Sequence, residues 1–266
     1  MKDRASLPDV DADAYVRELE EHRVRIRGAL RGPTSSLAAV ARHELPVGAA
    51  LRFGDGGGVD VRLAGMTRVV EVRATADGFV VDGSPTGPTN IDAGRYNLRL
   101  SHQNYPAVVV LDSESPHLTE EVERRWWPID PSLRVRARIE RDGSRASIGS
   151  TASSDRAVER VGWIRFAVAG TPARLLVTRL LEPGATQMDV YFRDATTGDG
   201  SYEVGRYVDV EHDGDDVIVD FNFAYNPACA LSPFYNCPIP PAENRLAVAI
   251  RAGEMTPLRK SGAAHR

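Results

Sequence analysis

The first regular pattern along the chain is a helical one near the N-terminus. The apolar residues that recur there at helical spacing are Tyr15, Leu19, Ile26 and Leu30. Val16 lies beside them. Either Asp11 or Asp13 can cap the start of this segment and offset the positive end of the helix dipole. Gly32-Pro33 ends the pattern. The sequence therefore predicts a helix from about Asp13 to Leu30, and a short second helix over Ser35–His43.

The pattern changes after Pro46, where short apolar segments alternate with turns rich in Gly, Asp and Pro. The predicted strands are Ala49–Phe53, Val59–Leu63, Thr67–Ala74, Phe79–Asp82, Tyr96–Leu100, Ala107–Asp112, Leu133–Glu140, Gly162–Ala169, Ala173–Arg179, Met188–Arg193, Tyr202–Glu211, Val217–Phe221 and Leu246–Ile250. Their spacing of about 8–12 residues is typical of a β-sandwich or β-barrel. We expect a hairpin loop over Asp142–Ser154 and a helix start within His117–Trp126.

These elements predict a mainly β, barrel- or sandwich-like single domain with an N-terminal helix packed against it. We expect an N-terminal helical segment over residues 1–46 and a β-rich domain over residues 47–255. The last segment, residues 256–266, is small and polar, and we expect it to be disordered. The mouth of a β-barrel is a natural place for a small-molecule site.

Composition and charge exclude several classes of protein. The chain has 266 residues with 42% apolar and 26% charged residues, which is ordinary for a globular protein. The formal net charge of −4 argues against binding nucleic acid through a broadly basic surface. No segment reaches the ~18 apolar residues of a membrane span, so we expect no membrane role. The N-terminus shows no apolar secretory segment, which makes the cytoplasm the expected compartment.

Polar and special residues are unusually dense between Tyr191 and Glu254. The segment Pro227–Pro241 carries five prolines, so it is expected to be a rigid, irregular loop with backbone groups that no ladder pairs. The residues that bracket it are candidates for one hydrogen-bonded cluster: Asp220, Asn222, Tyr225, Asn226, Glu243 and Arg245. Such a cluster either carries acid/base chemistry or pins the loop to the sheet.

Within that cluster we assign catalytic roles to Tyr225, Asp220 and Glu243. A carboxylate with a raised pKa, or a tyrosine with a lowered one, can move protons near neutral pH. Arg206 and Arg245 are assigned to an anionic group of the ligand. Asn222 and Asn226 complete the predicted ligand-binding set.

Cys229 and Cys237 are the only cysteines, and the proline-stiffened loop is expected to hold them close together. Buried thiols, a pair poised to oxidise, and a disulfide all fit the sequence, although a cytosolic setting disfavours a permanent bridge. Two thiols cannot by themselves form a structural zinc site, and no histidine pair has ligand spacing, so no metal is expected.

Other motifs narrow the function. The run Gly54–Gly58 is a turn rather than a phosphate loop, because no Gly-Lys-Ser/Thr follows. The chain has neither a Gly-x-Ser-x-Gly elbow nor a dinucleotide fingerprint, so we expect no nucleotide cofactor. The aromatic pair Trp126-Trp127 forms either a plug at the end of the sheet structure or the lip of a ligand pocket.

The C-terminal part resembles a bacterial family known as domain of unknown function 1684. The motifs that carry the resemblance are Phe192-Arg193-Asp194-Ala195-Thr196, Gly205-Arg206-Tyr207, Asp220-Phe221-Asn222, Ala224-Tyr225-Asn226-Pro227, Cys229-Ala230, Cys237-Pro238, Pro240-Pro241, Glu243-Asn244-Arg245-Leu246 and Ala252-Gly253-Glu254. The match is strong from about Val161 to Glu254. His22-Arg23 stands where the family often has Trp-Arg, and Pro33–Val47 departs from the family. The resemblance implies a fold and a signature, not a mechanism.

These observations favour a small-molecule-binding protein of bacterial metabolism, with cofactor-independent acid/base catalysis at the signature residues. The reaction class is not specified by the sequence. A non-catalytic β module with a structural signature loop is the alternative, and a thiol-redox protein that uses Cys229 and Cys237 is a third interpretation. If the signature side chains converge on an open cavity, the first is favoured. If they are buried and fully paired, the second is favoured.

Overall fold

The computed structural model of this protein describes residues 11–102, 105–152 and 155–260. Its longest helix is α1 (Ala12–Ala29), which begins after Asp11. The Asp11 carboxylate accepts hydrogen bonds from the backbone N–H groups of Asp13 and Ala14, so the predicted helix is confirmed with Asp11 as its cap. No helix in these described ranges is both long and apolar enough to cross a membrane.

Two small sheets form what we call the N-terminal lobe, residues 39–112. The first has the order β1 (Ala39–Glu44), β9 (Ala107–Asp112), β8 (Tyr96–Ser101), β7 (Asn90–Ala93). The second has the order β3 (Val61–Arg62), β2 (Ala50–Gly54), β4 (Val70–Thr75), β5 (Gly78–Val81), β6 (Ser84–Thr86). Apolar side chains from both sheets, such as Phe53 and Leu98, form one buried cluster between them.

A seven-stranded antiparallel sheet forms the C-terminal lobe, residues 133–252. Its order is β11 (Arg134–Arg138), β17 (Asp216–Asp220), β16 (Arg206–Asp213), β15 (Asp189–Phe192), β14 (Thr171–Leu180), β13 (Arg156–Val168), β12 (Glu140–Ile148). A second buried apolar cluster belongs to this sheet and includes Ile164, Val190 and Phe221. Strand order follows chain order except for β11, which lies beside β17 at the edge.

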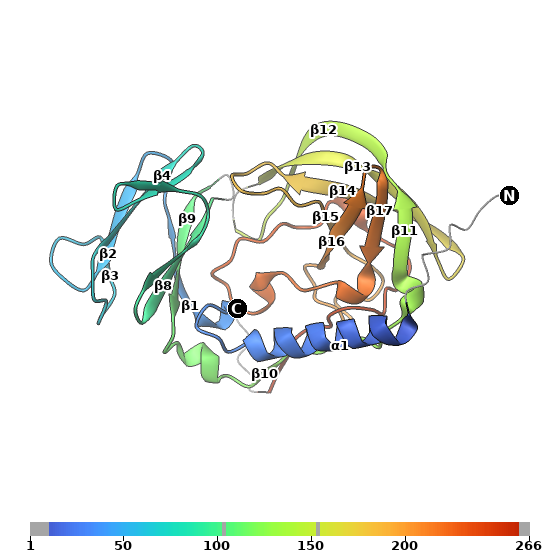
Figure 1. Cartoon of the computed structure of the whole chain (residues 1–266), viewed down its shortest axis with the longest axis horizontal. Coiled ribbons are helices and arrows are strands. Elements are labelled where there is room, and N and C mark those ends of the chain that lie inside the picture. The colour runs from blue at the N-terminus through green and yellow to red at the C-terminus, as the bar shows by residue number, and fades with distance from the viewer. Residues whose placement is uncertain (1–10, 103–104, 153–154, 261–266) are drawn as a thin grey trace.

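Figure 1 shows the strands of the N-terminal lobe grouped on one side, those of the C-terminal lobe on the other, and α1 running beneath the latter. A short pair, β10 (Val122–Glu123) with β18 (Leu258–Arg259), lies near the end of α1. The proline-rich loop joins the lobes, because Phe234 and Tyr235 pack on Val109 and Leu111 of β9. The mainly β, sandwich-like architecture with a packed N-terminal helix is therefore confirmed. The sheets described form no closed barrel.

Several local predictions are wrong. Residues predicted as a second helix form a single 3-10 turn, Ser36–Ala38, and then β1, because pairing with the apolar strand β9 outweighs local helix propensity. Most of the predicted loop over residues 142–154 belongs to β12, which pairs with β13, and positions 153–154 lie outside the described residues. The predicted helix start after His117 is the 3-10 turn Pro116–Thr119 followed by β10.

The C-terminal end also differs from expectation. The predicted strand Leu246–Ile250 is irregular, because its backbone bonds mostly to side chains and loop backbone: the N–H of Ile250 donates to the Asp194 carboxylate at 2.6 Å. In the predicted disordered tail, Leu258–Arg259 forms β18, while positions 261–266 lie outside the described residues.

Candidate functional site

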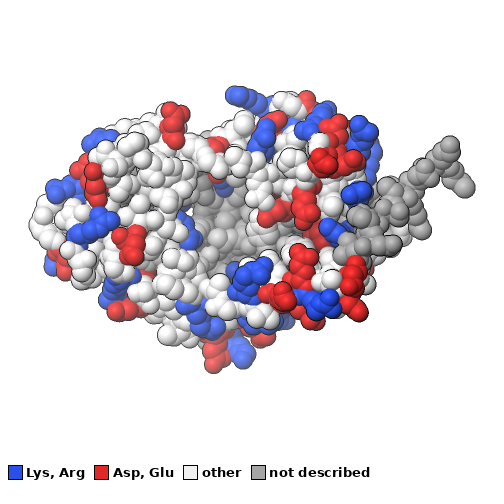
Figure 2. All heavy atoms as spheres, viewed as in Figure 1, with Lys and Arg blue, Asp and Glu red and all other residues white. Residues whose placement is uncertain are grey.

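A cavity of about 540 Å³ lies between α1, the neighbouring strands β16 and β17, and the chain that follows β17. Its polar lining consists of Glu18, His22, Ser36, Arg124, Asp209, Glu211, Asp220, Asn222, Tyr225, Asn226 and Glu254. Its apolar lining includes Ile26, Trp126, Ile218 and Phe223. Figure 2 shows that this face of the molecule is hollowed, with Asp and Glu side chains gathered on the C-terminal lobe beside the hollow. A volume of this size suits a small molecule.

One end of the cavity is built on a buried hydrogen-bond network. The Tyr15 hydroxyl from α1 donates to Asp220 at 2.7 Å and accepts from the Asn222 amide at 2.9 Å. Asn222 also bonds to both backbone groups of Asp130, and Arg134 lies 3.3 Å from the Asp220 carboxylate. Burial, and then the bond to Asp220, raise the pKa of Tyr15. Asp220 and Asn222 therefore fasten α1 to the sheet, and their hydrogen-bonding groups are engaged within the protein.

Another part of the cavity wall is built around Glu254, whose side chain is 4% exposed. Its carboxylate accepts from Arg124 at 2.5 Å and from the backbone N–H of Asn226 at 2.8 Å. The preceding Gly253 has a φ of +72°, and a Cβ there would lie 2.5 Å from the carbonyl oxygen of Ala224. Glycine is thus required at position 253 to bring Glu254 against the loop after β17.

Two carboxylates and two tyrosines meet where β15 and β16 pair. Asp189 and Asp209 are directly opposed across the antiparallel ladder. The Tyr225 hydroxyl donates to Asp209 at 2.9 Å, and the Tyr191 hydroxyl donates to Asp189 at 3.0 Å. Of the four, Asp209 and Tyr225 line the cavity. We call these four residues the carboxylate pair and its tyrosines.

Their surroundings raise the pKa values of Asp189, Tyr191 and Tyr225. Burial raises the pKa of Asp189 to about 6, the Tyr191 hydroxyl opposes the rise, and the neighbouring Asp209 adds to it. Burial also raises the pKa of Tyr225, with smaller contributions from Asp209 and Asp189. The expected lowered tyrosine pKa is therefore wrong: Tyr225 keeps its proton and acts as a hydrogen-bond donor. The group that titrates near neutrality is the carboxylate Asp189, which the sequence did not single out.

The helix and an aromatic residue form the remaining walls. His22 packs edge-on against Phe223 with ring centroids 5.0 Å apart, and burial followed by the charge of Arg25 lowers its pKa. Trp126 lines the cavity, and the guanidinium of Arg27 lies 5.0 Å from its ring centroid. Trp127 instead packs against Gly200. Of the two interpretations of the aromatic pair, Trp126 fits the lip of a pocket and Trp127 fits the plug.

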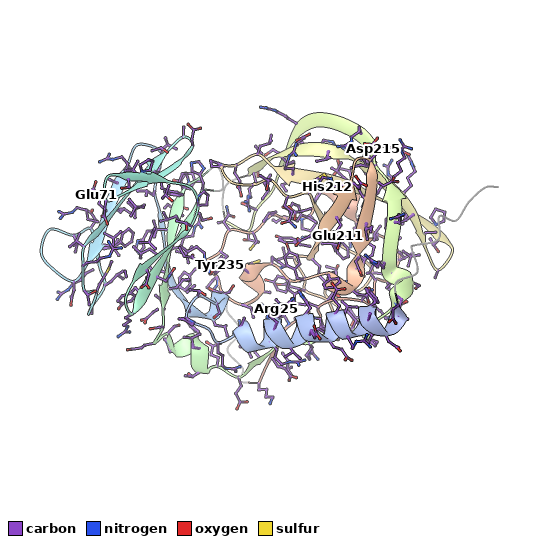
Figure 3. The ribbon with its side chains drawn as sticks, viewed as in Figure 1. Arg25, Glu71, Glu211, His212, Asp215 and Tyr235 are labelled. Carbon is purple, nitrogen blue, oxygen red and sulfur yellow. The ribbon has the colours of Figure 1, made fainter. Side chains whose placement is uncertain are left out.

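Two elements that bound the hollow can be followed in Figure 3, where Glu211 marks β16 and Arg25 marks α1. Glu211 lies two residues after Asp209, so both side chains leave the same face of β16. The Glu211 side chain is 70% exposed, and in the described ranges the only basic side chain that forms an ion pair with it is Arg134, at 3.9 Å.

Arg206 does not reach the cavity. Its side chain is 1% exposed, and it donates to the carbonyl oxygens of Ile250 at 2.8 Å and Ala252 at 2.5 Å. Its partner Asp194, 3.4 Å away, is equally buried. The anionic ligand group assigned to Arg206 has no place here, because these nitrogens hold the C-terminal segment in place. The preceding Gly205 brings the chain close to the carbonyl of Phe192.

Glu243 and Arg245 lie apart from the rest of the predicted cluster. Glu243 pairs with Arg160 at 3.0 Å on the surface, and bonds from its own backbone N–H and from Arg160 lower its pKa. Arg245 is exposed and forms a backbone bridge with Arg193. The residue between them, Asn244, is fully buried and bonds to backbone groups of Leu176 and Tyr191. The single cluster we expected is therefore wrong, because the loop places residues 220–226 and 243–245 at different sites.

The expected proximity of Cys229 and Cys237 is confirmed. The backbone N–H of Cys229 donates to the Cys237 sulfur at 3.4 Å, and both cysteines are free. The hydrogen bond between the two thiols lowers the pKa of Cys229. The same hydrogen bond, together with burial, raises the pKa of Cys237. Among the described residues, no three His, Cys, Asp or Glu side chains gather in a way that suits a metal ion.

Residues 123–255 match the family described as "Protein of unknown function (DUF1684)". The chain belongs to this family. It is also similar to the uncharacterized protein from gene locus rrnAC0354 of Haloarcula marismortui, known from a solution NMR structure. The two are 34% identical over 50% of this chain and 76% of that chain, with a TM-score of 0.42. A comparison with curated proteins found no match.

The DUF1684 match covers most of the cavity lining but not α1 or His22. Sequence reasoning named Asp220, Asn222, Tyr225 and Asn226, which all line the cavity. It missed Asp209 and Asp189, which lie in ordinary strands and carry no motif. Glu254 belongs to the signature motif Ala252-Gly253-Glu254, and no role was predicted for it. The neighbouring Gly253 was the signal in the sequence that could have pointed to Glu254, because a glycine there indicates a sharp turn of the chain.

Proposed function

We propose that this protein binds a small molecule in the cavity beneath α1 and acts on it by acid/base chemistry that needs no nucleotide cofactor. The observation that carries the proposal is the position of Asp209. Its carboxylate lines the cavity, accepts from the Tyr225 hydroxyl at 2.9 Å, and opposes Asp189 on the neighbouring strand.

Asp209 is the general base in this proposal, because it is the member of the carboxylate pair that a ligand reaches. Tyr225 orients it and, with its raised pKa, stays protonated. Asp189, on the neighbouring strand, keeps its proton up to a pH of about 6 because it is buried. In this proposal Asp209 takes a proton from one position of the ligand and gives the same proton back at another position, so the carboxylate is regenerated in each turnover.

The remaining signature residues act as scaffold in this proposal. Asp220 and Asn222 fix α1, and Arg206 fixes the segment that carries Glu254. These scaffold residues fit the alternative of a structural signature loop. The hydrogen bond between Tyr225 and Asp209 lies at the cavity instead, and the packing of the sheet does not require it. The proposal also includes a place in the cytoplasm of a bacterium. The two free, adjacent thiols support it, since a reducing compartment keeps such thiols unpaired.

The proposal is tested by a thermal-shift screen of a metabolite library against the wild type, Asp209→Asn and Tyr225→Phe. Metabolites that raise the melting temperature are then incubated with the protein, and products are identified by mass spectrometry. We expect Asp209→Asn to lower turnover by about 10²–10⁴-fold. We expect Tyr225→Phe to weaken turnover while the melting temperature of the free protein changes little, since the hydroxyl bonds to Asp209, a carboxylate that is itself exposed.

Tyr235→Phe is the matched control, because the Tyr235 hydroxyl bonds to Arg99 and lies outside the cavity lining. It should leave binding and turnover unchanged. Ligands whose binding and conversion are the same in all three variants as in the wild type would contradict the proposal.

A further inference from the structure

The charges that line the cavity are not balanced within it. Glu18 comes from α1, and Asp209 and Glu211 project from one face of β16. Over the described ranges, no basic side chain lies within 4.0 Å of the Glu18 or Asp209 carboxylates. Glu211 has only the distant contact with Arg134. Three carboxylates therefore face the cavity without a close counter-ion.

The cationic groups near the cavity are already engaged. Arg124 is bound to Glu254 at 2.5 Å, and Arg134 lies against Asp220 at 3.3 Å. Arg25 donates to the ring nitrogen of His22 at 3.2 Å. Arg23 and Arg27 both lie over the ring of Trp126. None of these groups neutralises Asp209 or Glu18.

His22 does not supply a positive charge at neutral pH. Burial lowers its pKa, and the charges of Arg25 and Arg23 lower it further, although Glu254 and Glu18 oppose them. At pH 7 the ring is therefore neutral. The cavity keeps the negative potential of its β16 wall, and a cleft lined by one sign of charge attracts ligands of the other sign.

The cavity also has an apolar and aromatic lining beside these carboxylates. Ile26 of α1 and Phe223 contribute to it, Ile218 of β17 pairs with Glu211, and the Tyr225 hydroxyl bonds to Asp209. A compact hydrocarbon body can be buried against these side chains. An aromatic ring next to a carboxylate also favours a cation over an anion at the same place.

We propose that the ligand of this cavity carries a positively charged nitrogen, as a primary amine or amidine, on a small apolar body. The nitrogen lies between Asp209 and Glu211, and the apolar body lies against Ile26 and Phe223. This inference rests on the proposed function, since it assigns a ligand class to the same cavity. It replaces the anionic ligand that the arginines of the signature suggested.

Three probes of similar size test it: benzylamine, benzoate and benzyl alcohol. Binding to the full-length protein is measured by calorimetry at pH 7. We expect benzylamine to bind about tenfold more tightly than either of the others. Raising the salt concentration from about 0.05 M to about 0.5 M should narrow that difference, because exposed charges are screened.

Glu211→Gln should weaken benzylamine binding several-fold and leave benzyl alcohol unchanged. Glu71→Gln on β4 is the matched control, because Glu71 is also a strand carboxylate within 4.0 Å of an arginine but lies in the other lobe (Figure 3). It should change nothing. If Glu71→Gln weakens benzylamine as much as Glu211→Gln, the amine binds to surface charge in general and the inference is wrong.

The two proposals fail in different ways. Suppose that benzoate or benzyl alcohol binds as tightly as benzylamine, and that Asp209→Asn weakens the binding of that probe and of benzylamine alike. This result overturns the ligand class and leaves the proposed function standing. Absence of benzylamine binding also overturns the ligand class. Conversion of any metabolite that is unaffected by Asp209→Asn overturns the proposed function, whatever the charge of the ligand.

Discussion

The two lobes of the molecule bury different kinds of side chain. In the N-terminal lobe the interior is apolar, and of the buried polar side chains described only His102 and Asp112 lie there, with Ser115 just beyond it. The others all lie within residues 156–254 and include Arg206, Asp194 and Asn244. The family match covers this second region and not the first.

The difference indicates what each lobe depends on. An apolar interior tolerates exchanges of similar volume, so many sequences can form the N-terminal lobe. A buried polar network specifies its partners one by one, because each group that loses its partner carries the full cost of desolvation. The signature of the C-terminal lobe therefore consists largely of residues in such networks, whereas Asp209 and Tyr225 line the cavity.

The largest effect is expected from Arg206→Met in the C-terminal lobe. It leaves Asp194 charged and unpaired in the interior, which should lower the free energy of unfolding by about 3–5 kcal/mol. The comparison is Arg95→Met in the N-terminal lobe, where the arginine side chain is 36% exposed and pairs with Asp112 at 2.7 Å. We expect a smaller loss there. Urea unfolding measures both, and equal losses would contradict the contrast between the lobes.

Leu98→Ala tests whether the apolar lobe unfolds by itself. Leu98 is fully buried, so the cavity left behind should cost about 3 kcal/mol. The three tryptophans, Trp126, Trp127 and Trp163, all lie outside the N-terminal lobe. We expect the change to lower the midpoint seen by circular dichroism and to leave the midpoint seen by tryptophan fluorescence near its wild-type value. A common shift of both signals would show that the lobes unfold together.

Asp220→Ala should lower the free energy of unfolding by about 1–3 kcal/mol, since Tyr15 and Asn222 lose their buried partner. Tyr15→Phe removes the same contact from the side of α1. Because the two residues share one hydrogen bond, the double variant should be less destabilised than the two single effects added together. Strict additivity in the thermodynamic cycle would mean that α1 is not fastened through this bond.

Opposite pH dependences should distinguish one carboxylate in each lobe. The folded protein keeps the Asp189 proton to about pH 6 while the unfolded chain loses it near 3.8, so stability falls as pH rises between these values. Asp189→Asn should remove this penalty and stabilise the protein at pH 8 by about 3 kcal/mol. Hydrogen bonding to Arg95 lowers the pKa of Asp112, which therefore stabilises the fold above its ordinary pKa.

Asp112→Asn should accordingly destabilise at pH 8, in the opposite direction to Asp189→Asn. Melting temperatures at pH 4 and pH 8 decide the signs. The same sign for both variants at pH 8 would show that Asp189 is not held in a site that disfavours its charge.

Sequence patterns were sufficient where the deciding interactions are local or alternate along one strand. The helix over residues 12–29 follows from its apolar spacing and from the cap at Asp11. Strands such as β9 and β17 follow from their apolar runs. The proximity of Cys229 and Cys237 follows from the short, proline-stiffened loop between them.

The tertiary structure decided which polar residues meet. Tyr15 reaches Asp220 across 205 positions of sequence, and Asp189 faces Asp209 only because β15 and β16 pair in one particular register. Arg206 and Arg245 belong to the same signature, yet one is buried and the other is exposed. Alternation along a strand fixes which side a residue faces, but the order of the strands and their register decide what it faces.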